Sequence, residues 1–134
     1  MKKTASILII AAVSAFTFGC KAQQTATYIY ADGSGNSYSI SADSIIYDPI
    51  TPAESSSGYY SGGEPFAEKL DEIEFQYISA MLDKAMGAKD EQTDTRVMGT
   101  GLIVRTKNKK EQEVFLKEDS RMKAKIEAWL SGFK

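Results

Sequence analysis

The feature that most constrains the fold is a strand–strand–helix pattern that occurs twice along the chain. Residues 27–47 alternate apolar and polar side chains around an Asp-Gly-Ser-Gly segment, which is typical of a β-hairpin. Apolar residues then recur at helical spacing over 72–86. Residues 96–106 and 112–117 predict a second hairpin, and 118–134 predict a second helix. The sequence therefore predicts an α+β fold in ββαββα order: two antiparallel β-hairpins form a sheet, and both helices cover one face.

Local signals define the first helix. Asp71 followed by Glu74 is a capping box, and Gly87 is a natural C-terminal residue. Within the first hairpin, Ile45–Tyr47 are predicted to extend the second strand past an irregularity at Ala42–Asp43. We expect the core to contain Leu102, Val104, Phe115, Phe75, Ile78, Leu82, Ile126, Trp129 and Leu130.

A loop rich in serine, glycine and proline separates the first hairpin from the first helix. The stretch 48–65 holds three prolines and the adjacent pair Tyr59 and Tyr60. Tyrosine among serine and glycine is typical of recognition loops, because tyrosine gives a large contact area at a small entropy cost. Two hypotheses stay open: the tyrosines bind a partner, or they fold back as a lid on the sheet.

The first twenty residues have the pattern of a secretory signal peptide. Lys2 and Lys3 precede an apolar run that ends at Phe18, which is shorter than the roughly 20 residues of a membrane span. The segment Thr-Phe-Gly-Cys resembles the lipobox of bacterial lipoproteins, with Gly19 and Cys20 at the matching positions. Thr17 and Phe18 depart from the usual leucine and small residue.

The resemblance implies that Cys20 is acylated and becomes the first residue of an exported protein. The expected organisation is a signal peptide at 1–19, a lipid-anchored tether at 20–26 and one globular domain at 27–134. Lys21, rather than aspartate, follows the cysteine, so the resemblance favours the outer membrane. An ordinary signal peptide with a chance cysteine, or a cytosolic protein with an apolar start, remains an alternative.

Charge is unevenly distributed along the exported part. Residues 20–95 contain four basic and thirteen acidic side chains, whereas 96–134 contain ten basic and five acidic ones. Either the two parts face each other in the fold, or the surface is dipolar and orients the domain on a membrane or partner. The acidic balance and the exported address both disfavour nucleic acid as a partner.

Residue types exclude several kinds of chemistry. The chain has no histidine and one cysteine, which excludes Ser-His-Asp, Cys-His and His-ligated metal sites. Asp32, Ser34, Asn36 and Asp43 follow part of a calcium-loop spacing, but Ser37 replaces the required glycine, and a polar hairpin turn is the better interpretation. We predict no metal, cofactor or catalytic residue.

Two further clusters have ordinary structural explanations. Glu68, Asp71, Glu72 and Glu74 could supply paired carboxylates for glycan hydrolysis, but acidic residues at a helix start favour the helix dipole. The two glycines of Met-Gly-Thr-Gly-Leu lie within a predicted strand, which indicates a bulge or a close backbone crossing.

Lys107, Lys109 and Lys110 form a basic hairpin tip. They would contact anionic lipid headgroups under one hypothesis, and simply be a solvated turn under the other. For the whole protein we favour a non-catalytic binding or assembly module, attached to the membrane by lipid and bound to a protein or envelope component. The alternatives are an inhibitor of an extracytoplasmic enzyme that presents the tyrosine loop, and a carboxylate-dependent glycan hydrolase.

Overall fold

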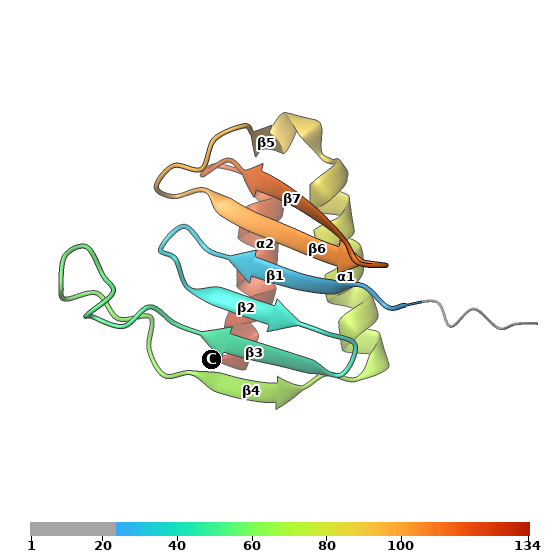
Figure 1. Cartoon of the computed structure of the whole chain (residues 1–134), viewed down its shortest axis with the longest axis horizontal. Coiled ribbons are helices and arrows are strands. Elements are labelled where there is room, and N and C mark those ends of the chain that lie inside the picture. The colour runs from blue at the N-terminus through green and yellow to red at the C-terminus, as the bar shows by residue number, and fades with distance from the viewer. Residues whose placement is uncertain (1–23) are drawn as a thin grey trace, which may run out of the picture.

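A seven-stranded antiparallel sheet organises residues 24–134, which are the residues that the computed structural model describes (Figure 1). The strand order across the sheet is β4-β3-β2-β1-β6-β7-β5. The strands are β1 (Thr27–Ala31), β2 (Ser37–Ile40), β3 (Ser44–Asp48), β4 (Phe66–Lys69), β5 (Gln92–Thr93), β6 (Gly101–Lys107) and β7 (Lys110–Leu116). The helices are α1 (Glu72–Gly87), α2 (Arg121–Leu130) and two short 3₁₀ helices, Lys89–Glu91 and Ser131–Phe133. The predicted α+β class is confirmed.

The sheet has more strands than the two predicted hairpins. The predicted irregularity at Ala42–Asp43 is a complete reversal of the chain, so β2 and β3 are separate strands, paired antiparallel with Ile40 opposite Ile45. Local hydrogen bonds explain the turn. The Ser41 amide donates to the carbonyl of Ser44 (2.9 Å), and the Ser41 hydroxyl donates to the Asp43 carboxylate (3.0 Å).

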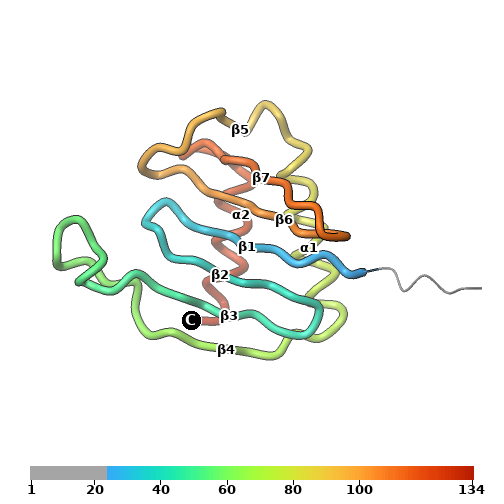
Figure 2. Tube along the Cα trace, in the orientation of Figure 1, coloured from blue at the N-terminus to red at the C-terminus, as the bar shows by residue number. Residues whose placement is uncertain are grey.

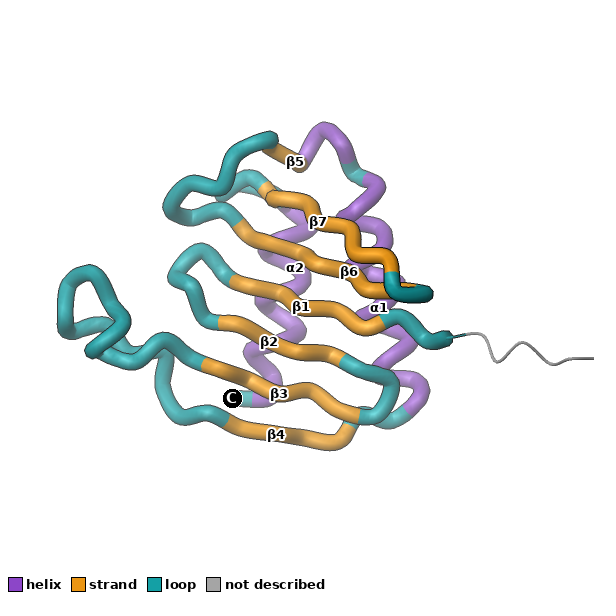
Figure 3. Tube along the Cα trace, in the orientation of Figure 1, coloured by secondary structure: helices purple, strands orange, loops and turns teal. Residues whose placement is uncertain are grey.

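Two short strands complete the edges of the sheet (Figure 3). β4 pairs with β3, and β5 pairs with β7 through the Gln92–Leu116 register. β5 is two residues long and lies in a polar connector, so it has no periodicity that a sequence pattern could reveal. Edge strands of this length limit the exposed backbone available for unwanted pairing.

Both helices pack on the same face of the sheet (Figure 2). The capping box of α1 is confirmed: the Glu74 amide donates to the Asp71 side chain (2.7 Å), and the Asp71 amide donates to Glu74 (2.9 Å). At the start of α2, the Glu91 carboxylate accepts bonds from the Ser120 hydroxyl (2.6 Å) and the Met122 amide (2.8 Å). These bonds, above all the one from Ser120, lower the pKa of Glu91.

The core lies between the sheet and the helices. Four predicted core residues are confirmed as buried: Ile78, Leu82, Ile126 and Leu130. Phe75 and Trp129 are partly buried and pack against that core.

The prediction for three other residues is wrong. Leu102, Val104 and Phe115 lie half-buried on the opposite face of the sheet, and their neighbours Ile103 and Leu116 are the buried ones. Residues 102–104, Leu-Ile-Val, put apolar side chains on both faces of the strand, so the sequence pattern does not reveal which face packs against the helices.

Four tyrosines form much of the sheet's contribution to the core. Tyr28, Tyr30, Tyr38 and Tyr47 are each at most 3% exposed. The hydroxyls of the first two donate to carboxylates on the helices, Tyr28 to Asp83 (2.9 Å) and Tyr30 to Glu127 (2.8 Å). Burial is the main cause that raises the pKa of both phenols well above the ordinary value. These bonds connect the sheet to α1 and α2.

Candidate functional site: the loop end of the sheet

Three loops lie at one end of the sheet, where β1 and β3 finish and β6 begins (Figure 1). They comprise residues 32–36, 49–65 and 94–100, and we call them the loop end. Two of them touch through backbone: the Gly99 amide donates to the carbonyl of Gly33 (3.4 Å), and a Cβ on Gly33 would lie 2.7 Å from the Gly99 Cα. The predicted close backbone crossing is therefore confirmed at Gly99.

Asn36, in the first of these loops and buried, connects that loop to the 49–65 loop. Its side-chain amide nitrogen donates to the Asp32 carboxylate (2.8 Å) and to the Tyr60 hydroxyl (2.9 Å), and its amide oxygen accepts from the Ile50 backbone (3.0 Å). A Cβ on Gly62 would come within 2.0 Å of that oxygen. The base of the 49–65 loop is thus fixed to the hairpin turn by side-chain and backbone hydrogen bonds.

The two tyrosines of this loop have different environments. Tyr60 is 40% exposed and its hydroxyl is held by Asn36, whereas Tyr59 is 92% exposed. The lid hypothesis does not describe the pair, because Tyr60 is held at the hairpin turn and Tyr59 projects. The partner-binding hypothesis stays a prediction. Behind Tyr59, the loop is ordered by local bonds: Glu54 accepts from the Thr51 amide (2.9 Å) and hydroxyl (2.7 Å), which lowers the pKa of Glu54.

Sequence reasoning missed two exposed apolar residues at the loop end. Val97 is 61% exposed and Met98 is 89% exposed, on the loop that leads into β6. The sequence predicted a strand from residue 96, but the strand begins at Gly101, after a turn in which the Thr100 hydroxyl donates to the Val97 carbonyl (2.7 Å). The glycine pair around Thr100 was the available signal for that turn.

The opposite end of the sheet, which we call the tether end after the tether predicted at 20–26, is where the described residues begin at Gln24. Thr27, the first residue of β1, pairs with Thr106 near the end of β6. The basic tip, Lys107–Lys110, therefore lies beside the point where the described chain begins. Its turn residues Asn108 and Lys109 have φ values of 52° and 61°, and Lys107 pairs directly with Lys110.

Both features of the basic tip are locally unfavourable. A lysine in the left-handed region is strained where glycine would be relaxed, and two like charges directly opposite each other repel. Lys107, Lys109 and Lys110 are all exposed. The structure brings these three side chains together at the tether end and separates them from Tyr59 and Tyr60 at the loop end.

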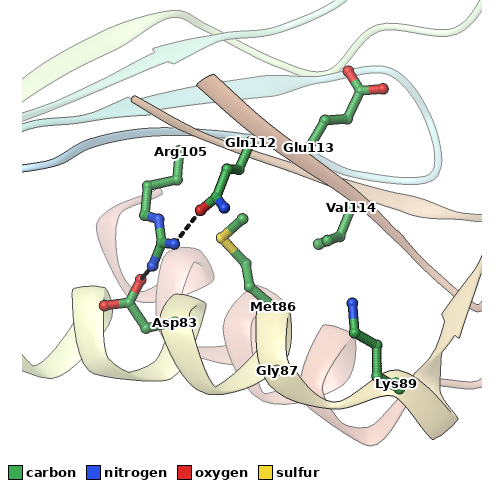
Figure 4. Close-up of a pocket in the computed structure, with 8 residues that line it drawn as sticks. All are labelled: Asp83, Met86, Gly87, Lys89, Arg105, Gln112, Glu113 and Val114. Carbon is green, nitrogen blue, oxygen red and sulfur yellow. Dashed lines mark hydrogen bonds and ion pairs between the residues drawn. The ribbon is translucent and has the colours of Figure 1, made fainter. Parts of the chain in front are cut away.

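A cleft between α1 and the β6–β7 hairpin measures about 490 Å³ and is open to solvent (Figure 4). The Arg105 guanidinium donates to the Asp83 carboxylate (2.8 Å) and to the Gln112 side chain, and Asp83 also accepts from Tyr28. Glu113 points away from the cleft. Because Asp83, Arg105 and Gln112 are paired with one another, they tie α1 to the sheet.

Local structure explains three of the other acidic candidates. Asp32 accepts from the backbone amides of Ser34 (2.9 Å) and Asn36 (3.0 Å), which is a polar hairpin turn. The acidic residues Asp71 and Glu74 cap α1. Among residues 24–134, no group of three or more acidic or cysteine side chains is arranged to hold a metal ion. Cys20 lies outside the described residues.

Comparisons with protein-family models, with curated protein sequences and with solved structures find no match. Within the described part of the chain, no helix has both the length and the apolar character that a membrane crossing requires.

Proposed function

We propose that the protein is a lipid-anchored component of the bacterial cell envelope, in the outer membrane, that acts as a non-catalytic binding or assembly module. Acylated Cys20 attaches the chain, and the loop end binds a protein or another envelope component. The observation that carries the proposal is the opposition of the two ends: the described chain begins at Gln24, and the loops that hold the exposed Tyr59 and Met98 lie at the far end of the strands.

The build of the loop end supports a binding role. Asn36 and the Gly33–Gly99 contact fix the bases of the loops, so the exposed apolar side chains project from an ordered frame. A frame of this kind reduces the entropy that binding removes. Exposed tyrosine and methionine are also residue types that are enriched at protein interfaces.

The test combines Tyr59→Ala with Met98→Ala in the lipidated protein and measures partner recovery after cross-linking in native membranes. We expect recovery to fall about tenfold or more, because a tyrosine at the centre of an interface is often worth about 2 kcal/mol or more. The matched control is Tyr77→Ala, since Tyr77 is 58% exposed but lies on α1. Equal recovery from both variants would contradict a binding role for the loop end.

Tyr59 also favours the inhibitor hypothesis as a second candidate, because it is the most exposed large apolar side chain of a loop fixed at its base. That reading requires the recovered partner to be an enzyme whose turnover falls when the wild-type protein is added. It is contradicted if the Tyr59→Ala variant lowers turnover as strongly as the wild type.

A further inference from the structure

The face of the sheet away from the helices, which we call the open face, carries a group of apolar residues near its middle. Ile29 and Ile46 are 45% and 48% exposed there, and three half-buried residues, Leu102, Val104 and Phe115, lie on the same face. The register makes them neighbours, with Ile29 opposite Val104 and Leu102 opposite Phe115. A water-facing side of an antiparallel sheet normally carries polar residues at these positions. An apolar group that spans several strands marks a surface that another molecule covers.

The open face carries Lys69 on β4 and Asp48 on β3 towards one side, and two glutamates on β7 towards the other side. Lys69 lies on β4 and is paired with Ser44, whereas Glu111 and Glu113 lie on β7 and are paired with Thr106 and Val104. Within the described residues, neither Lys69 nor the two glutamates forms an ion pair in its own copy. The lysine on β4 and the glutamates on β7 are complementary to each other when the surface is turned about a two-fold axis.

The position of the tether favours one two-fold axis over the other. An axis parallel to the strands, passing over β1 and β2, stacks two open faces and keeps both tether ends on the same side. It also brings β4 of each copy over β7 of the other, so that Lys69 faces Glu111. An axis perpendicular to the strands would direct the two tether ends in opposite directions, so that at least one seven-residue tether, which reaches at most about 25 Å, would have to run back along the fold to the shared membrane.

We propose that the open face binds the open face of a second copy. The two sheets then form a two-fold symmetric β-sandwich in which both tether ends point towards the same membrane. The choice of axis rests on the anchoring in the proposed function. Two sheets stacked in this way lie about 10 Å apart, and their inner side chains interdigitate. Attachment to one membrane raises the effective concentration of the copies, so a modest contact is sufficient. Both loop ends then project away from the membrane and offer a two-fold partner surface.

The first test places a cysteine near the axis. Ser39 is exposed on β2, between Ile29 and Ile46 in the register. Because stacked sheets lie about 10 Å apart, too far for a disulfide, we expect Ser39→Cys to give a cross-linked dimer when membranes are treated with a short bismaleimide, whose spacer crosses that gap. Acylation of Cys20 leaves no competing thiol. The control is Ala124→Cys, which is exposed on α2 and faces away from the proposed contact. Cross-linking of Ser39→Cys no greater than that of Ala124→Cys would overturn the proposal.

The second test exchanges charges in the Ser39→Cys protein. Lys69→Glu alone, or Glu111→Lys with Glu113→Lys, should lower the dimer yield about tenfold, because like charges then oppose each other across the contact. The three substitutions together should restore the yield. Unchanged yields, or no restoration, would overturn the proposed arrangement, and circular dichroism verifies that each variant is folded.

The two proposals fail separately. A protein whose Cys20 carries no lipid by mass spectrometry, but whose Ser39→Cys variant still cross-links when Cys20→Ser removes the other thiol, refutes the anchor and keeps the pairing of open faces. A lipidated protein whose Ser39→Cys variant stays monomeric refutes the pairing and keeps the anchor.

Discussion

The two faces of the sheet use the same strands in different ways. On the face that the helices cover, Tyr30, Ile45 and Ile103 are fully buried, and the Tyr30 hydroxyl has a carboxylate partner. On the open face, their sequence neighbours Ile29, Ile46 and Val104 are also apolar but remain partly exposed. When a strand is apolar on both of its faces, its sequence therefore does not identify the face that will be buried. The position of the helices decides which face becomes part of the core.

The largest expected effect compares two adjacent residues of β6. Ile103→Ala should lower the free energy of unfolding by about 2–5 kcal/mol, because it leaves a cavity in a fully packed region. Val104→Ala should cost less than about 1 kcal/mol, because its side chain is only half-buried. Urea denaturation of the two variants measures both values, and equal losses would show that the open face belongs to a core within one copy.

The sequence was sufficient for the elements that have strong local signals. The capping box at Asp71 defined the start of α1, and the apolar stripe through Ile78 and Leu82 identified its buried side. It was insufficient where a structure depends on distant partners. β5 exists because Gln92 meets Leu116, and the parity of β6 depends on helices elsewhere in the chain.

The same distinction applies to the candidate site. Composition alone identified the 48–65 loop and its tyrosines. The different environments of Tyr59 and Tyr60 depend on Asn36, which lies 24 residues before Tyr60 in the sequence. The exposure of Val97 and Met98 was missed because an apolar pair before a glycine is also typical of a strand. The sequence predicted such a strand over residues 96–106.

A smaller effect concerns alkaline pH and the covered face. Burial, above all, raises the pKa of the Tyr30 phenol in the folded protein. The contribution of this group to the free energy of unfolding is therefore fully present below pH about 10, where the unfolded chain begins to lose the proton. Above that pH stability should fall by about 1.4 kcal/mol per pH unit for this one proton. Denaturant titrations of wild type and Tyr30→Phe at pH 10 and 11 check this, and the variant should show a shallower loss. An identical pH dependence would contradict it.

Acid should weaken the helix layer to a smaller extent, at the start of α2. Hydrogen bonds from Ser120 and Met122 lower the pKa of Glu91 in the folded protein. The contribution of Glu91 to stability is therefore present at pH values above the ordinary glutamate pKa, and it is lost as the pH falls through the pKa of the folded state. Melting temperatures of wild type and Glu91→Gln should therefore converge as the pH is lowered below about 4. A constant difference between them at all pH values would show that the charge of Glu91 does not hold the helix.

The smallest expected effect on the stability of a single copy comes from the open face itself. Ile46→Thr keeps a β-branched side chain at a half-exposed position, so we expect the free energy of unfolding to change by no more than about 0.5 kcal/mol in dilute detergent. The adjacent Ile45 is fully buried and supplies the matched control, since Ile45→Thr places a hydroxyl in the core at a cost of about 1–3 kcal/mol. In membranes, Ile46→Thr should nevertheless reduce cross-linking through Ser39→Cys, because it removes apolar contact from the region next to the proposed axis. A large loss of stability in Ile46→Thr would instead show that one copy already uses this face for its own folding, and the difference between the two faces would disappear.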